Sequence, residues 1–331
     1  MSTTCDPPVR TLIIGASSFL GGHLRRAAGA AGHTVLTAGR SGDWSLRLDL
    51  AADRAERVAA LIADAAPDVV VNCAGATSGG ADVLAAANVT AVHTLVTALL
   101  RNTVRQNRGR TGDGARPSPR LVHIGSAAEY GSVADGVPVT EDAVPRPAGL
   151  YGATKLGGTR LVELARTAGL DAVVLRVFNV VGAGSPEDTL PGAATAQLRQ
   201  IAQLRQIRQL RQIGQLGHGG SLKLGPLDAV RDFVDARDVA DAVLAAATAP
   251  TLPHAIVNIG SGAGVPARVL VRQLLIAAGL DVTVHEDAPG SARSAGLGWQ
   301  QAAISRAGAD LGWRPRRDLA DSVRALWDGA S

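Results

Sequence analysis

The sequence predicts an α/β fold in which a doubly wound parallel sheet carries helices on both faces. Two observations lead to this prediction. Short apolar runs alternate with alanine- and leucine-rich stretches over the first half of the 331-residue chain, as strands and helices do in such folds. The runs are apolar throughout rather than at every second position, which is typical of parallel strands that are buried on both sides.

The expected elements follow one another in a regular order. We expect strands at residues 10–17, 33–39, 67–76, 120–131 and 171–182. We expect helices at residues 19–32, 53–66, 88–102 and 151–168. This order is Rossmann-like. It predicts a main domain over residues 1–180, with residues 225–260 returning to it, and a smaller C-terminal lobe mainly over residues 181–331.

Three segments interrupt this order. Residues 105–120 and 288–299 are rich in glycine and predict surface loops. Residues 197–217 form a tandem repeat with an apolar residue at every third position. On an α-helix this period drifts by about 60° per step, so no continuous apolar face forms. A duplicated insertion that lengthens a surface helix explains the repeat better than a basic helix that binds a partner or nucleic acid.

The composition is that of a globular protein without a metal or disulfide framework. Acidic residues are interspersed with basic ones and the net charge is only +4, so we expect no nucleic-acid partner, whereas an anionic small substrate fits. Cys5 and Cys73 do not suggest a disulfide framework or a metal site. The first ten residues do not resemble a signal peptide and no apolar run approaches 18 residues, so we expect a cytoplasmic protein without a membrane span.

A candidate nucleotide-binding turn follows the first strand. The stretch GASSFLG places Gly15, Ser18 and Gly21 at three-residue spacing between that strand and a helix. Glycines allow the backbone to approach a pyrophosphate, and the helix N-terminus supplies amide donors and a positive dipole end. A plain strand-to-helix turn is the alternative, since this chain is rich in glycine.

The end of the second strand indicates which nicotinamide cofactor binds. An acidic residue there binds the ribose 2′-hydroxyl of NAD, whereas an arginine accepts the 2′-phosphate of NADP. Gly39 occupies the acidic position and is followed by Arg40 and Ser41, which favours NADPH over NAD. Arg40 as one more solvated arginine is the alternative. Asp49 is placed to reach the adenine amino group.

Two scarce residue types of the chain meet in one helix. The sequence contains two tyrosines and two lysines, and Tyr151 and Lys155 lie four positions apart, on one helix face. A nearby ammonium favours the phenolate, which suits a tyrosine that exchanges a proton with a ketone or alcohol oxygen. Ser126, at the end of a strand, offers a second hydroxyl for the same oxygen. A surface pair on a helix is the alternative reading.

These motifs resemble the extended short-chain dehydrogenase/reductases, the family of nucleotide-sugar epimerases, dehydratases and ketoreductases. The similarity runs nearly end to end through GASSFLG, NCAG, NVTAVHTLV, GSAAEYG, EDAVPRPAGLYGATK, LRVFNVVG, LGPLDAVRDFVDARDVADAV, VNIGSG and ADLGWRP. It implies that residues 181–331 form a substrate-binding lobe and that the protein is a homodimer joined through residues 88–102 and 151–168.

The resemblance also implies roles for individual residues. The catalytic set is Ser126, Tyr151 and Lys155. The implied substrate-binding residues are Ser126, Glu129, Asn179, Arg231 and Arg293, of which the two arginines bind the diphosphate. Glu129 orienting its loop, instead of touching the sugar, is an equal alternative. The implied cofactor-binding residues are Gly15, Ser17, Ser18, Phe19, Leu20, Gly21, Arg40, Ser41, Asp49, Leu50, Ala74, Gly75, Tyr151 and Lys155.

Within the family, the resemblance favours one reaction. The 4,6-dehydratases carry an Asp-Glu pair after the catalytic hydroxyl, where this chain has Ala127 and Ala128. The expected activity is therefore NADPH-dependent reduction of a nucleotide-linked 4-keto-6-deoxyhexose, an EC 1.1.1-type reaction of deoxysugar and antibiotic biosynthesis. The scarcity of lysine beside many arginines is typical of a GC-rich genome, and this signature favours TDP over GDP. A 4-epimerase with bound NAD and a non-catalytic nucleotide-sensing protein remain alternatives.

Overall fold

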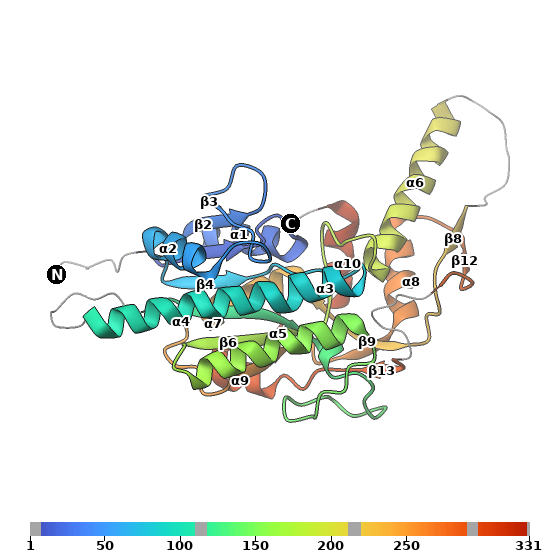
Figure 1. Cartoon of the computed structure of the whole chain (residues 1–331). Helices are drawn as coiled ribbons and strands as arrows, with labels where there is room; N and C mark the ends of the chain where they lie inside the picture. The colour runs from blue at the N-terminus through green and yellow to red at the C-terminus, as the bar shows by residue number, and fades with distance from the viewer. Residues whose placement is uncertain (1–7, 110–117, 211–219, 290–296, 330–331) are drawn as a thin grey trace, which may run out of the picture.

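The computed structural model describes residues 8–109, 118–210, 220–289 and 297–329 (Figure 1). Its larger sheet has seven parallel strands in the order β10-β6-β5-β4-β1-β2-β3. These strands are β1 (Arg10–Ile14), β2 (Thr34–Gly39), β3 (Leu46–Arg47), β4 (Val69–Asn72), β5 (Arg120–Ser126), β6 (Ala172–Val177) and β10 (Ile256–Ile259). This sheet confirms the predicted Rossmann-like α/β class.

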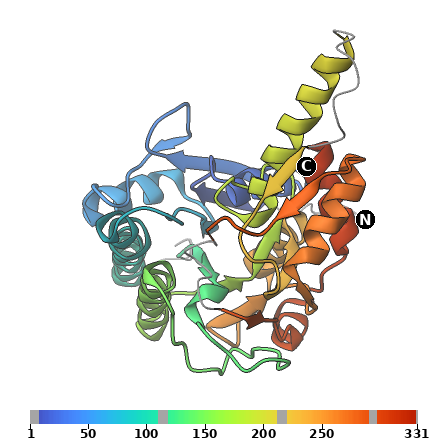
Figure 2. The same cartoon turned by 90° about the vertical axis from the view of Figure 1, so that its right-hand side faces the viewer.

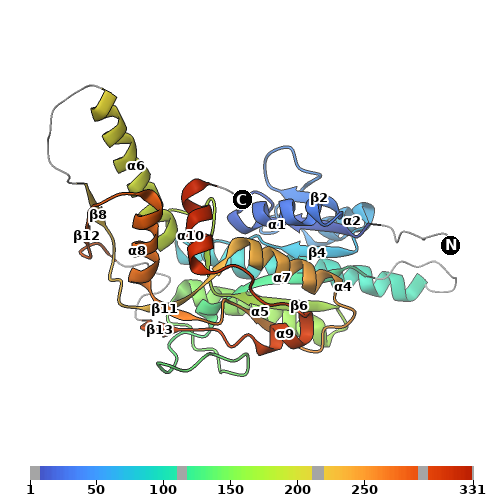
Figure 3. The same cartoon turned by 180° about the vertical axis from the view of Figure 1, so that it is seen from behind.

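Helices cover both faces of this sheet. One face carries α2 (Ala55–Ala65), α4 (Ala91–Gly109) and α5 (Leu150–Thr167), and the other carries α1 (Phe19–Ala30), α7 (Ala236–Thr248) and α9 (Ser305–Leu311) (Figures 1 and 3). Successive strand residues alternate between the two cores: Leu12 joins the first and Ile13 the second. Uniformly apolar strands are therefore required, as the sequence pattern indicated.

A smaller lobe follows β6. Its four-stranded sheet contains β7 (Asn179–Val181), β9 (Val230–Asp235), β11 (Gly264–Pro266) and β13 (Trp299–Gln300). A two-stranded sheet pairs β8 (Ser221–Lys223) with β12 (Thr283–His285). The lobe's helices are α6 (Leu190–Leu210), α8 (Ala267–Ala278) and α10 (Leu319–Asp328). A third apolar core lies between these elements.

The chain departs from several predicted boundaries. The strand expected at 171–182 divides at Phe178, because β6 joins the large sheet while β7 pairs with β9. Within residues 225–260, α7 and β10 pack with the large sheet, but β9 belongs to the lobe sheet. The helix expected at 88–102 begins as the π-helical turn η1 (Ala86–Thr90), after the short α3 (Ala81–Ala85). Since α4 continues to Gly109, the prediction of a loop at 105–109 was wrong.

One stretch meets the length and composition of a membrane-spanning helix. Residues Ala81–Thr103 are apolar enough, and half of that stretch is buried inside the protein. Its buried side chains, such as Val92, Leu95 and Leu99, contribute to the core beneath α2 and α5. This is the behaviour of a packed helix in a globular domain.

Candidate active site

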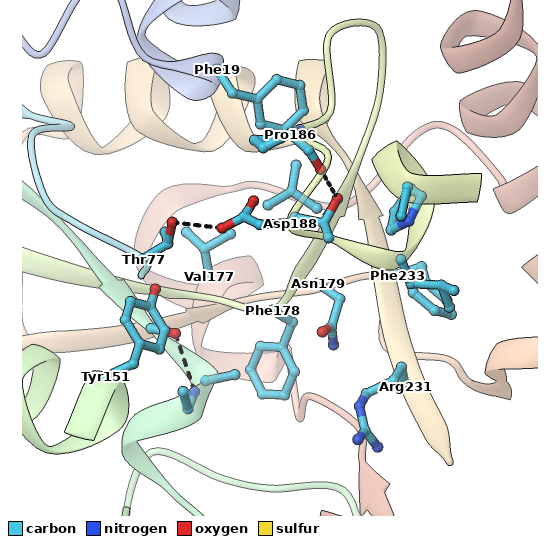
Figure 4. Close-up of a pocket in the computed structure, with 18 of the residues that line it drawn as sticks. Phe19, Thr77, Tyr151, Val177, Phe178, Asn179, Pro186, Asp188, Arg231 and Phe233 are labelled. Atoms are coloured by element: carbon cyan, nitrogen blue, oxygen red, sulfur yellow. Dashed lines mark hydrogen bonds between the residues drawn. The ribbon is translucent and has the colours of Figure 1, made fainter. Parts of the chain in front are cut away.

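A cavity of about 700 Å³ opens where the strands of the large sheet end and the lobe begins. Ligands of open α/β sheets bind outside the carboxyl ends of the strands, which is where this cavity lies. It brings together ten of the residues predicted from the sequence: Ser18, Phe19, Leu20, Ala74, Gly75, Ser126, Tyr151, Lys155, Asn179 and Arg231. Figure 4 shows Tyr151 on one side of the cavity and Asn179 and Arg231 on the other.

Ser126 ends β5 and begins a short 3₁₀ turn, η2 (Ala127–Glu129). Its Oγ accepts a hydrogen bond from the Ala128 amide at 3.2 Å. Its own amide donates to the Glu129 carboxylate at 2.8 Å, which closes a reciprocal cap. This cap fixes the backbone that carries the hydroxyl.

Lys155 lies one turn after Tyr151 on α5, and both line the cavity. The lysine is 7 % exposed, and its Nζ donates to the Ile124 carbonyl at 2.5 Å. Burial lowers the pKa of Lys155, and the charge of Glu129 acts in the opposite direction. Burial also raises the pKa of Cys73 to about 12, so this thiol stays neutral beside the lysine.

Asn88 is a cavity residue that the sequence analysis did not identify. It lies in η1, where its side chain exchanges hydrogen bonds with the backbone of Ala76 at 3.0 and 2.9 Å and donates to Thr154 Oγ1 at 3.1 Å. It therefore ties the loop after β4 to the helix that carries Tyr151 and Lys155. The available signal was an asparagine among the apolar residues of a buried helix.

Glu129 does not reach the cavity, so the predicted sugar contact is not supported. Its side chain is fully buried, and Oε2 accepts a hydrogen bond from Arg176 Nε at 2.8 Å. The Arg176 guanidinium also stacks over the Tyr130 ring, 4.6 Å from the centroid. The carboxylate faces inward because the 3₁₀ turn rotates position 129 away from Ser126 Oγ, toward β6. The geometry matches the alternative, in which Glu129 orients its loop.

The turn after β1 offers a cradle for a nucleotide. Gly15 has a φ of +81°, and a Cβ there would lie 2.7 Å from the Ala74 amide nitrogen. Ser18 caps α1 by accepting a hydrogen bond from Gly21. The N-terminus of α1 lines the cavity through Ser18, Phe19 and Leu20, where its backbone amides and positive dipole end favour an anion. These features fit the pyrophosphate of a nicotinamide dinucleotide.

The remaining cofactor candidates lie away from the cavity lining. Gly15 and Gly21 contribute backbone beneath it, and Ser17 is exposed. Arg40 and Ser41 are exposed on the loop after β2. The Asp49 carboxylate accepts from the Ala51 amide. Leu50 packs into the core beneath α2 and α4.

Trp44 folds the loop after β2 back onto that strand. Its Nε1 donates to the Ser41 carbonyl at 2.6 Å. A Cβ at Gly39 would lie 2.5 Å from the same nitrogen, so the indole fills the space in which a side chain at position 39 would stand. A glycine is therefore required at the position where NAD-binding enzymes place an acid.

The lobe side of the cavity carries the predicted diphosphate residues. Arg231 is 7 % exposed, and its guanidinium donates to the carbonyls of Val230 at 2.8 Å and Leu297 at 2.6 Å. Burial lowers the pKa of Arg231. Asn179 Nδ2 donates to the Asp232 carbonyl at 3.2 Å. Arg293 lies outside the described residues.

The cavity also contains polar residues that were not predicted. Thr77 Oγ1 donates to the Asp188 carboxylate at 3.0 Å, which joins the loop after β4 to the loop before α6 (Figure 4). Lys223, Glu187 and Gln300 also line it. Among the described residues no group of three or more histidine, cysteine, aspartate or glutamate residues is placed to hold a metal ion.

Comparison with known proteins agrees with this geometry. The family model described as "NAD dependent epimerase/dehydratase family" matches residues 11–260. The chain is 34% identical to the dTDP-6-deoxy-L-talose 4-dehydrogenase (NAD(P)(+)) of Kitasatospora kifunensis, covering 100% of this chain and 98% of the relative. It is 28% identical to the GDP-6-deoxy-D-mannose reductase of Pseudomonas aeruginosa, covering 96% and 95%.

Solved structures share the fold of this chain. The structure of RMD from Pseudomonas aeruginosa complexed with NADPH superposes with a TM-score of 0.74 at 25% identity, covering 97% of each chain. MoeE5 in complex with UDP-glucose and NAD superposes with a TM-score of 0.76 at 24% identity, covering 97% of this chain and 98% of MoeE5. The chain belongs to the NAD-dependent epimerase/dehydratase family of extended short-chain dehydrogenase/reductases, as an NAD(P)-dependent oxidoreductase of CH–OH groups.

Proposed function

We propose that the protein is an NADPH-dependent 4-ketoreductase of a nucleotide-linked 4-keto-6-deoxyhexose, with TDP as the nucleotide. The observation that carries the proposal is that Ser126, Tyr151 and Lys155 share one cavity with the cradle at α1 and with Arg231. Such a cavity has a place for a dinucleotide at one end and for a diphosphate-linked sugar at the other, with two hydroxyl groups between them.

The chain's own residues supply the proton chemistry. A nicotinamide dinucleotide whose pyrophosphate lay at the cradle would supply the hydride. Tyr151 gives its phenolic proton to the carbonyl oxygen, and Ser126 Oγ donates a hydrogen bond to the same oxygen. The buried ammonium of Lys155, held by the Ile124 carbonyl, stabilises the phenolate that this transfer leaves behind.

Elimination of water fits this cavity less well than reduction does. A dehydratase needs an acid and a base beside the sugar, directly after the catalytic hydroxyl. Ala127 and Ala128 line the cavity there, and neither can exchange a proton. Glu129, the nearest carboxylate in sequence, is already engaged by Arg176.

The preference for NADPH rests on the loop after β2. Trp44 occupies the space beside Gly39, so an acid that would bind the ribose diol of NAD has no room there. Arg40 follows on an exposed stretch, where a guanidinium can meet a 2′-phosphate.

The relatives support the sugar and the nucleotide. A 4-dehydrogenase working in reverse is a 4-ketoreductase, and one relative is named as acting on a dTDP-linked 6-deoxyhexose. Epimerase is the second candidate, because the UDP-glucose 4-epimerase of Corynebacterium glutamicum is 31% identical over 62% of this chain. Deoxysugar and antibiotic biosynthesis in the cytoplasm is the setting that this proposal implies.

The test is nicotinamide absorbance with TDP-4-keto-6-deoxyglucose or its C3 epimer, and with NADPH and NADH in separate assays. We expect NADPH oxidation that Tyr151→Phe abolishes. Consumption only with the GDP-linked ketone would correct the nucleotide. Tightly bound NAD that is never released, with interconversion of C4 epimers, would replace reductase by epimerase.

The proposal includes a homodimer joined through α4 and α5. Leu150 and Leu164 on α5 are 59% and 65% exposed, although both are large and apolar. Light scattering should give twice the mass of one chain, and Leu164→Glu should shift the mass toward that of a monomer. A wild-type monomer at micromolar concentration would contradict this part.

A further inference from the structure

The second lysine of the chain also lies in the cavity. The sequence has 33 lysine and arginine residues, yet its two lysines, Lys155 and Lys223, both line the same pocket. Lys155 donates to the Ile124 carbonyl, and Arg231 donates to two backbone carbonyls. The ammonium of Lys223 has no hydrogen-bond partner among the described residues and is the cation there that can follow a ligand.

Strand β8 turns the Lys223 side chain away from the core of the lobe. Leu222 is fully buried in the core of the lobe, and neighbouring residues of a strand point to opposite faces. Lys223 therefore faces away from that core. One edge of β8 pairs with β12, in the register Lys223 to His285.

A glutamine of the tandem repeat covers the other edge of β8. Gln197 Nε2 donates to the Lys223 carbonyl at 2.9 Å, and Gln197 Oε1 accepts from the Lys223 amide at 3.0 Å. One side-chain amide thus makes both hydrogen bonds that a neighbouring strand would make with that residue. Gln197 is the first residue of the repeat at 197–217.

The residues around Gln197 brace the same part of α6. Leu198 is fully buried in the lobe core, and the Arg199 guanidinium donates to the carbonyls of Leu326 and Trp327 at 3.1 and 2.8 Å. Further along, Leu204 is 51% exposed, and α6 projects beyond the rest of the lobe (Figures 1 and 2). The start of the repeat is therefore fixed in the protein, and Gln197 is held at one place relative to β8.

We propose that Lys223 binds the diphosphate of the nucleotide-linked substrate and that Gln197, from the repeat, is the residue that positions it. The proposal rests on the proposed function for the class of substrate. Arg231 and Phe233 lie on the side of the cavity away from Phe19, the first residue of α1 (Figure 4). Lys223 lines the same cavity and belongs, like them, to a strand of the lobe. It therefore meets the phosphates of the sugar nucleotide rather than those of the dinucleotide. An ammonium suits this task as a compact charge that follows its ligand.

Calorimetric titration of the full-length protein with TDP, GDP and NADP⁺ separates the two phosphate sources. Lys223→Met should weaken binding of the preferred nucleoside diphosphate by about 10- to 100-fold, because a charge-assisted contact is lost. Lys223→Arg should restore most of the affinity. NADP⁺ binding should change less than about twofold. Loss of NADP⁺ affinity instead, or unchanged diphosphate affinity in Lys223→Met, would overturn the proposal.

Gln197→Ala should weaken diphosphate binding by a smaller factor, about 3- to 10-fold. It should have no further effect in a Lys223→Met background, since Gln197 acts through that lysine. Gln200→Ala is the matched control, an exposed glutamine one turn further along α6. Additive effects of the two substitutions would show that Gln197 has only a structural role. Ketone reduction with unaltered diphosphate binding in every variant would reject this inference and leave the proposed function intact.

Discussion

The large sheet and the lobe hold their polar residues in different ways. At the large sheet, Ser126 is held by the buried Glu129 of η2, and Lys155 of α5 is held by the Ile124 carbonyl on β5. In the lobe, β8 has three residues, and Lys223 depends on a glutamine side chain from a helix. The proposed proton chemistry would thus depend on residues held by the large sheet, and the proposed recognition of the substrate on residues held by the lobe.

The largest effect should follow from removing the charge behind the proton donor. Lys155→Met keeps the volume of the buried side chain but removes the ammonium that stabilises the Tyr151 phenolate. We expect kcat/KM for ketone reduction to fall by about 10²- to 10⁴-fold. In the alcohol-oxidising direction the pH profile should move to higher pH, because the phenolate is the base.

Steady-state kinetics in both directions check this prediction. The circular dichroism spectrum and the thermal midpoint should be retained, since a methionine fits a buried site that disfavours charge. A loss of less than tenfold would mean that Lys155 serves the fold rather than the reaction. The comparison with Lys223→Met is direct, because that change should act mainly through KM.

The ion pair beneath Ser126 tests how rigid the large sheet is. Glu129 and Arg176 are 0% and 1% exposed in their side chains, and their contact is 2.8 Å long. Glu129→Gln preserves an acceptor for the Ser126 amide but leaves the buried guanidinium uncompensated. We expect the free energy of unfolding to fall by about 3–5 kcal/mol.

Chemical denaturation measures this change. The double variant Glu129→Val with Arg176→Leu should recover a large part of the loss, because replacing both charges by apolar groups removes the unpaired guanidinium. A change below about 1 kcal/mol in the single variant would show that water reaches the pair.

The sequence predicted local features better than those made by distant contacts. Tyr151 and Lys155 were identified because four residues on a helix fix their relation, and the turn at Gly15 because strand, turn and helix are contiguous. The two alternatives for Glu129 stayed open in the sequence because its partner, Arg176, is 47 residues away. Asn88, Asp188 and Lys223 were missed because each becomes a cavity residue only when distant elements pack together.

The ends of the strands and helices also depend on contacts between residues that are distant in the sequence. The apolar pattern of residues 171–182 is continuous, and the division at Phe178 depends on which strands stand beside each half. The repeat at 197–217 has no single apolar face, yet α6 forms because its first turns make specific contacts with β8 and α10. Neither result could be obtained from periodicity alone.

A smaller effect is expected at the loop after β2, on which the proposed preference for NADPH rests. Gly39→Asp places a side chain where the Trp44 indole stands, at 2.5 Å. We expect a loss of about 1–3 kcal/mol in stability from overpacking, and no gain in NADH use. The double variant with Trp44→Ala should relieve the strain and raise the ratio of NADH to NADPH activity.

Binding of 2′,5′-ADP and ADP by calorimetry, together with thermal midpoints, checks this prediction without turnover. An efficient switch to NADH in Gly39→Asp alone would show that the indole moves aside at little cost. The loop after β2 would then adjust its packing to a new side chain more easily than the strands of the large sheet can.

The smallest effect concerns the stability of the protein in acid and depends on a buried histidine of the large sheet. His123 on β5 is 1% exposed, and its pKa lies well below the usual value because burial, and then the charge of Lys155, disfavour the imidazolium. The unfolded chain therefore binds one more proton there below about pH 6.5. Stability from this residue is complete above that pH and falls by about 1.4 kcal/mol for each pH unit below it.

His123→Gln keeps an acceptor for Asn72 Nδ2, which lies 3.2 Å from His123 Nδ1, and removes the titrating group. Its free energy of unfolding should fall less steeply between about pH 6.5 and 5 than that of the wild type. Denaturation curves of the two proteins at several pH values measure these slopes. Equal slopes would mean that His123 takes up its proton in the folded protein as readily as in the unfolded chain, and burial in the large sheet would then not exclude the imidazolium.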